Sequence, residues 1–109
     1  MKEWRAIVPL TEIPRLGARM LQTDTLDIAL FRASNDEVFA LKDSCPHQGG
    51  PLSQGLVHGN AVSCPLHNWK IDLQSGEVLG PDEGCVNTFA VKVVEGMVYL
   101  SLPVESFVV

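Results

Sequence analysis

Two short segments, each carrying one cysteine and one histidine, constrain this chain more than any other feature. A single proline separates Cys45 from His47, and sixteen further residues lead to Cys64, which is followed by His67. Thiolates and neutral imidazoles are side chains that bind zinc and iron in proteins. One metal centre can use all four side chains only if the fold brings two loops together, so the surrounding chain must form a scaffold that holds both.

Two kinds of metal centre use two cysteines and two histidines. One is a structural zinc ion, and the other is a pair of irons bridged by sulfides, with the cysteines on one iron and the histidines on the other. Zinc modules usually place at least two residues between paired ligands, whereas only one separates Cys45 from His47. In an extended loop this spacing puts the two residues about 6 to 7 Å apart. The spacing favours two irons, with zinc as the alternative.

The residues around the four candidate ligands extend the pattern to two whole loops. Their sequences are Cys-Pro-His-Gln-Gly-Gly-Pro-Leu at 45–52 and Cys-Pro-Leu-His-Asn-Trp at 64–69. These segments resemble the two cluster-binding loops of the Rieske iron-sulfur family, and residues 69–76 resemble the strand and turn that follow in Rieske ferredoxins. Residues 79–86, Leu-Gly-Pro-Asp-Glu-Gly-Cys-Val, resemble most the small subunit of assimilatory NAD(P)H-dependent nitrite reductase.

This resemblance implies a fold, a cofactor and a ligand set. The expected fold is all-β, with a Rieske-like β-sandwich base and an inserted cluster-binding subdomain at about residues 45–80. The cofactor would be a Rieske-type 2Fe-2S cluster, bound by Cys45, His47, Cys64 and His67. In such a cluster the two cysteines hold one iron and the two histidines the other. Because imidazoles donate less charge than thiolates, the reducing electron should reside on the histidine-bound iron.

The resemblance also implies a function in electron transfer. The chain would pass electrons within a cytosolic nitrite reductase, which reduces nitrite to ammonium in nitrate assimilation, beside a large subunit with FAD, an iron-sulfur cluster and sirohaem. It would be an enzyme subunit without a complete substrate-turnover site, since it has no Gly-rich dinucleotide-binding motif. The alternative is a free Rieske ferredoxin of an aromatic ring-hydroxylating dioxygenase system. A zinc-stabilised adaptor without redox activity is a third possibility.

Composition excludes several other classes of function. With 109 residues and 46% hydrophobic content, the chain is expected to form one domain over residues 1–109. Eight basic against thirteen acidic residues give a formal charge of -5, which disfavours nucleic acid and anionic membranes as partners. The first apolar run ends at Pro9, too early for a signal peptide or a membrane-spanning helix. A cytoplasmic location is therefore expected.

Short β-rich runs between glycine, proline and Asn-Asp turns predict a chain of strands without a long helix. Thr11 could begin a short helical piece that Pro14 ends. Of the remaining candidate residues, His58 is expected at a surface turn and Cys85 is expected to be a small buried residue. The predicted strands are 4–8, 18–22, 26–32, 37–41, 61–63, 69–72, 78–79, 89–94 and 97–102.

Two positions after the second loop predict the redox potential. High-potential Rieske relatives place a serine and a tyrosine there, whose hydroxyls donate to the cluster sulfurs. Trp69 and Ile71 stand at the corresponding positions of this chain and have no hydroxyl. The expected potential is therefore toward the low end of the Rieske range, which runs roughly from -150 to +300 mV.

Overall fold

The computed structural model describes residues 2–22, 27–44, 51–64, 69–79 and 84–103. These residues form β-strands and two single-turn 3₁₀ helices, with no α-helix among them. The predicted all-β class is confirmed. The strands are β1 (Lys2–Pro9), β2 (Gly17–Gln22), β3 (Asp27–Arg32), β4 (Val38–Lys42), β5 (Leu56–His58), β6 (Ala61–Ser63), β7 (Lys70–Asp72), β8 (Val78–Leu79), β9 (Thr88–Phe89), β10 (Val91–Val94) and β11 (Met97–Pro103), and the 3₁₀ helices are η1 (Leu10–Glu12) and η2 (Leu52–Gln54).

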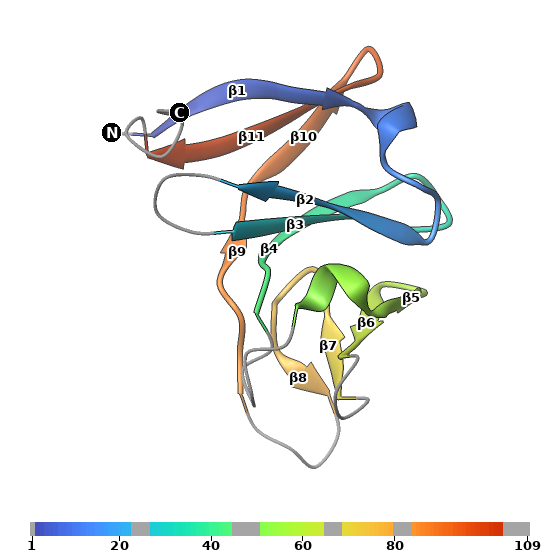
Figure 1. The fold of residues 1–109 in the computed structure, drawn as a ribbon. Helices are drawn as coiled ribbons and strands as arrows, with labels where there is room; N and C mark the ends of the chain where they lie inside the picture. The colour runs from blue at the N-terminus through green and yellow to red at the C-terminus, as the bar shows by residue number, and fades with distance from the viewer. Residues whose placement is uncertain (1, 23–26, 45–50, 65–68, 80–83, 104–109) are drawn as a thin grey trace.

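The strands form three antiparallel sheets that stack in layers (Figure 1). The outer sheet has the order β1-β11-β10, the middle sheet β2-β3-β4-β9, and the inserted sheet β5-β6-β7-β8. The middle sheet lies between the other two. Together the outer and middle sheets are the base, and the inserted sheet belongs to the chain between β4 and β9.

Strand β3 of the middle sheet is buried on both faces. Its run Ile28-Ala29-Leu30-Phe31 is fully buried, and side chains alternate across a strand. Ile28 and Leu30 pack toward the outer sheet, in a cluster with Val98 and Leu100. Ala29 and Phe31 pack toward the inserted sheet. A continuous apolar run without alternation is typical of a strand that is covered on both sides.

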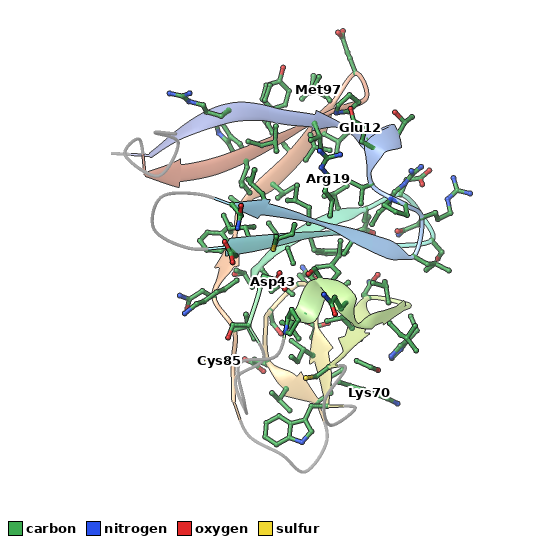
Figure 2. The ribbon with its side chains drawn as sticks, viewed as in Figure 1. Glu12, Arg19, Asp43, Lys70, Cys85 and Met97 are labelled. Atoms are coloured by element: carbon green, nitrogen blue, oxygen red, sulfur yellow. The ribbon has the colours of Figure 1, made fainter. Side chains whose placement is uncertain are left out.

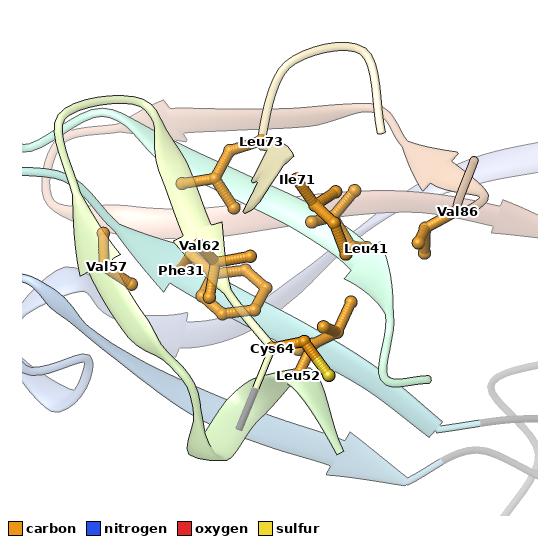
Figure 3. Packing of buried hydrophobic residues seen from close by; sticks show 10 residues of the cluster. Phe31, Leu41, Leu52, Val57, Val62, Cys64, Ile71, Leu73 and Val86 are labelled. Carbon is orange, nitrogen blue, oxygen red and sulfur yellow. The ribbon is translucent and has the colours of Figure 1, made fainter. Parts of the chain in front are cut away.

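The second of these clusters joins the base to the inserted sheet (Figure 3). We call it the shared cluster, because both parts of the fold contribute to it. Its members from the base and from the insertion are Ala29, Phe31, Leu41, Leu52, Val57, Val62, Cys64, Ile71, Leu73 and Val86.

The insertion leaves and rejoins the base at neighbouring positions. Leu41 of β4 pairs with Thr88 of β9, and the Lys42 N–H donates to the Asn87 carbonyl at 2.9 Å. The cluster-binding subdomain was expected to end at about residue 80, and contacts of the inserted sheet continue beyond that position. Val86 is buried in the shared cluster, and its N–H donates to the Gly76 carbonyl at 2.7 Å. The inserted unit therefore extends to Val86.

Each predicted strand overlaps an observed one, but three details differ from the expectation. The predicted strand at 89–94 is divided at Ala90, because β9 pairs with β4 whereas β10 pairs with β11. The short strand β5 was not predicted. The helical piece expected from Thr11 is the 3₁₀ turn η1, which begins one residue earlier, after Pro9. Within the described ranges, no helix is long and apolar enough to cross a membrane.

Candidate metal centre

The structure describes one of the four predicted ligands. Cys64 follows β6 directly, and its side chain is fully buried. Cys45, His47 and His67 lie outside the described residues, so their roles as ligands stay predictions. The residues on either side of both predicted ligand loops are described, and they show how the fold supports each loop.

The second ligand segment is closed by a backbone hydrogen bond. The Cys64 N–H donates to the Trp69 carbonyl at 2.8 Å, so the two ends of residues 65–68 are held together. Strand β7 begins at the next residue, Lys70, and pairs with β6. The Trp69 ring is half-buried and packs against the shared cluster. This segment is therefore a short connection between two paired strands, which fixes where it begins and ends.

The first ligand segment is closed by a side chain. The Asp43 carboxylate accepts two hydrogen bonds from Ser53, one from its N–H at 2.7 Å and one from its hydroxyl at 2.8 Å. Asp43 lies where the base meets the inserted unit (Figure 2). Cys45 and His47 stand between these two residues in the sequence, so the pair joins the two ends of the segment that carries them.

The described residues next to the two segments meet in the shared cluster. Leu52, just before Ser53, and Cys64 are both fully buried in it, and Figure 3 shows their side chains at the same end. Leu52 follows the first segment, and Cys64 begins the second. The expectation that the fold brings both segments to one place is thus supported by the residues next to them.

Close backbone packing behind these residues requires a glycine. Gly55 follows η2, and a Cβ built on it would lie 2.2 Å from the Ser63 carbonyl oxygen. Real Cβ atoms do not approach a carbonyl so closely. The absence of a side chain at position 55 therefore lets the chain after the first segment pass directly beside β6, which leads to Cys64.

Sequence reasoning missed Asp43 and Ser53. One signal was available. Asp43 stands two residues before a predicted ligand and Ser53 follows the same loop, so the carboxylate could accept hydrogen bonds from the serine across the loop. Asp, Asn and Ser often satisfy backbone groups near turns. Their pairing over nine intervening residues is a tertiary contact, however, and no local pattern specifies it.

The other candidate residues divide into one success and one error. His58 is exposed, as predicted, and its Nε2 forms a hydrogen bond with the Ser63 hydroxyl at 2.7 Å. Cys85 was expected to be buried, and this is wrong because the thiol is exposed. The backbone of Cys85 forms an isolated antiparallel β-bridge with Glu77, and the residue borders an open cleft with Ser75. The next residue, Val86, takes the buried position. Among the described residues, no three His, Cys, Asp or Glu side chains gather as a metal site.

Comparisons with known sequences identify relatives along most of the chain. The family model of the Rieske-like [2Fe-2S] domain matches residues 3–101. The 3-phenylpropionate/cinnamic acid dioxygenase ferredoxin subunit of Photorhabdus laumondii is 36% identical over 101 residues, which cover 91% of this chain and 94% of that protein. The 4beta-methylsterol monooxygenase of Methylococcus capsulatus is 52% identical over 46 residues, which cover 42% of this chain but only 12% of that protein.

Solved structures share the same fold. One of them is assigned as the NADH-dependent nitrite reductase small subunit from Mycobacterium tuberculosis. It superimposes with a TM-score of 0.83, covering 94% of this chain and 97% of that chain at 21% sequence identity. At that identity the similarity concerns the fold alone.

Proposed function

This chain belongs to the Rieske-like [2Fe-2S] domain family, and from that premise we propose that it is a ferredoxin that supplies single electrons to a terminal oxygenase. As a member of this family it carries a Rieske-type 2Fe-2S cluster and transfers electrons. The observation that supports an oxygenase as partner is the 36% identity with a dioxygenase ferredoxin subunit, because the match covers nearly the full length of both proteins. On this ground we propose the oxygenase ahead of the nitrite reductase, which reverses the order expected from the sequence.

We propose Cys45 and Cys64 as the ligands of one iron, and His47 and His67 as the ligands of the other. Two thiolates and two imidazoles are the donor set of a Rieske centre. The described residues fit this set, since the Cys64 thiol is fully buried among apolar side chains and water is kept from it. The paired hydrogen bonds between Asp43 and Ser53 hold the ends of the other ligand segment.

The bound cluster supplies reversible one-electron chemistry. The part of this chain is to hold and orient it. Cys64 would hold its iron from within the shared cluster of apolar side chains, and we propose that electrons would leave and enter through the histidine-bound iron. Imidazoles donate less charge than thiolates, so the added electron is favoured there.

A second candidate function is the small subunit of a nitrite reductase. Residues 79–86 favour it, because their sequence resembles that subunit more than a dioxygenase ferredoxin. In this case the partner would be a large subunit with FAD, an iron-sulfur cluster and sirohaem. The two candidates share the cofactor and its ligands and differ only in the partner.

The cofactor is tested first, on freshly purified protein. We expect two irons and two sulfides per chain, no stoichiometric zinc, and a Rieske EPR signal after reduction with dithionite. Colourless protein that holds zinc, and stays colourless after anaerobic cluster reconstitution, would refute the electron-carrier function and favour an adaptor.

The partner is tested by mixing. Reduced protein is combined anaerobically with one of two acceptors, a purified oxygenase component of the 3-phenylpropionate dioxygenase type or a nitrite reductase large subunit, and reoxidation is followed by visible absorbance. We expect rapid reoxidation by the oxygenase only. Reoxidation by the sirohaem protein alone would reverse the assignment. A His67→Ala variant is the control, because it should show no Rieske absorbance to follow in either mixture.

A further inference from the structure

We propose that Asp43 and Ser53 form a clasp that positions the first cluster-binding segment and slows the loss of the cluster. The clasp consists of the two hydrogen bonds from Ser53 to the Asp43 carboxylate. This inference rests on the proposed ligands Cys45 and His47, which lie between the two residues in the sequence. It makes Asp43 a positioning residue, since it acts on the cluster through the segment that it closes.

In the clasp, two donors of Ser53 bind the two carboxylate oxygens of Asp43. The Ser53 N–H donates to Oδ1 of Asp43 at 2.7 Å, and the Ser53 hydroxyl donates to Oδ2 at 2.8 Å. Ser53 lies in η2, whose first N–H groups have no partner inside the helix. Asp43 therefore caps η2 from ten residues away. Hydrogen bonds to a charged carboxylate are stronger than those between neutral groups.

Each half of the clasp is anchored in the fold. The Asp43 N–H donates to the Asp27 carbonyl at 2.9 Å, which ties Asp43 to the start of β3. On the other side, Leu52 is fully buried in the shared cluster, and η2 packs against β2 and β3. The clasp therefore joins two residues that the fold holds in place. The segment between them begins and ends at a constant separation.

Fixed ends matter for a loop that supplies metal ligands. Groups that orient the ligands of a metal centre commonly contribute 10 to 100-fold, as an order of magnitude, to its affinity for the metal. A loop whose ends are held loses less conformational freedom when it binds the cluster. Loss of the clasp should therefore speed cluster release and widen the range of ligand geometries.

The chain contains a matched control for this effect. Asp72 accepts the same two kinds of hydrogen bond from Ser75, from the N–H at 2.9 Å and from the hydroxyl at 2.8 Å. This pair spans only three residues, in the exposed turn after β7. Asp72→Ala removes the same chemistry from the inserted unit without opening a ligand segment.

The test compares iron release from the oxidised holoprotein to a strong chelator, together with the EPR spectrum of the reduced protein. We expect release to be about tenfold faster in Ser53→Ala, which loses one hydrogen bond, and roughly a hundredfold faster in Asp43→Ala, which loses both. Asp43→Asn should lie nearer to wild type, because its amide can accept from the Ser53 N–H and donate to the hydroxyl. Asp72→Ala should match wild type within about twofold.

The EPR signal separates positioning from stability alone. We expect a broadened or shifted signal in Asp43→Ala and an unchanged one in Asp72→Ala. Wild-type release and an unchanged signal in Asp43→Ala would overturn the clasp while leaving the proposed function intact. If Asp43→Ala does not fold, Ser53→Ala decides by the same two measurements. Wild-type protein with no Rieske signal would instead overturn the ligand assignment, and the role of the clasp with it.

Discussion

The three histidines of this chain differ in what their loss should do. Replacement of His47 or His67 by alanine removes one of the two proposed imidazoles from an iron. We expect both variants to lose the cluster or its Rieske EPR signal. The measurement is the EPR spectrum of the dithionite-reduced protein, with iron and sulfide contents determined on the same samples.

His58 is the matched control for that experiment. It is exposed, and its partner is the Ser63 hydroxyl, so His58→Ala should keep the wild-type signal and iron content. Equal losses in all three variants would contradict the ligand assignment. This comparison is sharp because His58 lies in the same inserted unit as both proposed ligands.

A second residue-scale prediction concerns Asp36. Its carboxylate accepts hydrogen bonds from Arg32 at 3.0 Å and from Arg15 at 3.2 Å. The Arg32 hydrogen bond is the main cause that holds the pKa of Asp36 below its ordinary value, and the charge of Arg15 adds to it. A lowered pKa in the folded state stabilises the fold above the unfolded-state pKa, and this contribution is lost as the pH falls through the folded-state pKa.

Asp36→Asn should therefore unfold at a lower urea concentration than wild type at pH 7. The difference should begin to narrow as the pH falls below about 4, where an aspartate of the unfolded chain becomes protonated, and should vanish below the lowered folded-state pKa of Asp36. Urea unfolding across this range measures it. Glu12→Gln, which removes the exposed ion pair with Arg19, is the comparison. A difference between wild type and Asp36→Asn that does not depend on pH would contradict the prediction.

For single residues, the sequence predicted the chemistry of side chains better than their burial and their contacts. The Cys and His spacing indicated the 2Fe-2S cluster, which the family match confirms, while the four ligands stay predictions. The exposure of Cys85 could not be predicted, because it depends on which of two adjacent residues points inward, and Val86 does. The contact between Asp43 and Ser53 likewise depends on how β4 and η2 meet.

Among the elements, the short turn after η2 depends on one glycine. Gly55 has no left-handed backbone geometry, yet its Cβ would lie 2.2 Å from the Ser63 carbonyl oxygen. Gly59 has a φ of +59°, and a Cβ there meets nothing within 4 Å. Position 55 therefore requires glycine for lack of space, whereas position 59 favours glycine because of its backbone conformation.

We expect Gly55→Ala to cost more stability than Gly59→Ala. Alanine at position 59 carries a left-handed conformation that costs about 1 to 2 kcal/mol. At position 55 the backbone of β6 must move, which costs typically 1 to 3 kcal/mol or more in a packed site, and the chain leading to Cys64 is disturbed. Urea unfolding and iron content measure both effects. A Gly55→Ala variant with wild-type iron content and stability would contradict this account.

Most strands could be predicted because their apolar runs and turn residues are local. The exceptions depend on which strands pair. β5 is only three residues long, and it is a strand because β6 pairs with it. The break between β9 and β10 reflects a change of partner from β4 to β11, which a continuous β-rich sequence does not reveal.

For the molecule as a whole, the redox potential is the property that its function most depends on. Isoleucine has no hydroxyl, so Ile71 cannot donate a hydrogen bond to a sulfur of the 2Fe-2S cluster. Its side chain is fully buried among the apolar residues of the shared cluster. We expect a midpoint potential below zero, toward the low end of the Rieske range of roughly -150 to +300 mV. A redox titration followed by EPR measures it, and a value well above zero would contradict the prediction.

The three-layer order was predictable in outline, because the ligand loops fall between two strand-rich segments. Its energetic basis was not. The base and the inserted unit share one apolar cluster, so Phe31 of the middle sheet stabilises the layer that carries Cys64. That one domain spans residues 1–109 stays a prediction.

The two ends of the insertion lie next to each other, so the inserted unit could be replaced as a whole. Lys42 and Asn87 are joined by a backbone hydrogen bond of 2.9 Å, so a replacement segment whose ends lie equally close together would leave β4 and β9 in place. Such a graft must match the apolar side chains that the base presents, among them Phe31 and Leu41. Inserted units with different metal centres could then be compared on one unchanged base.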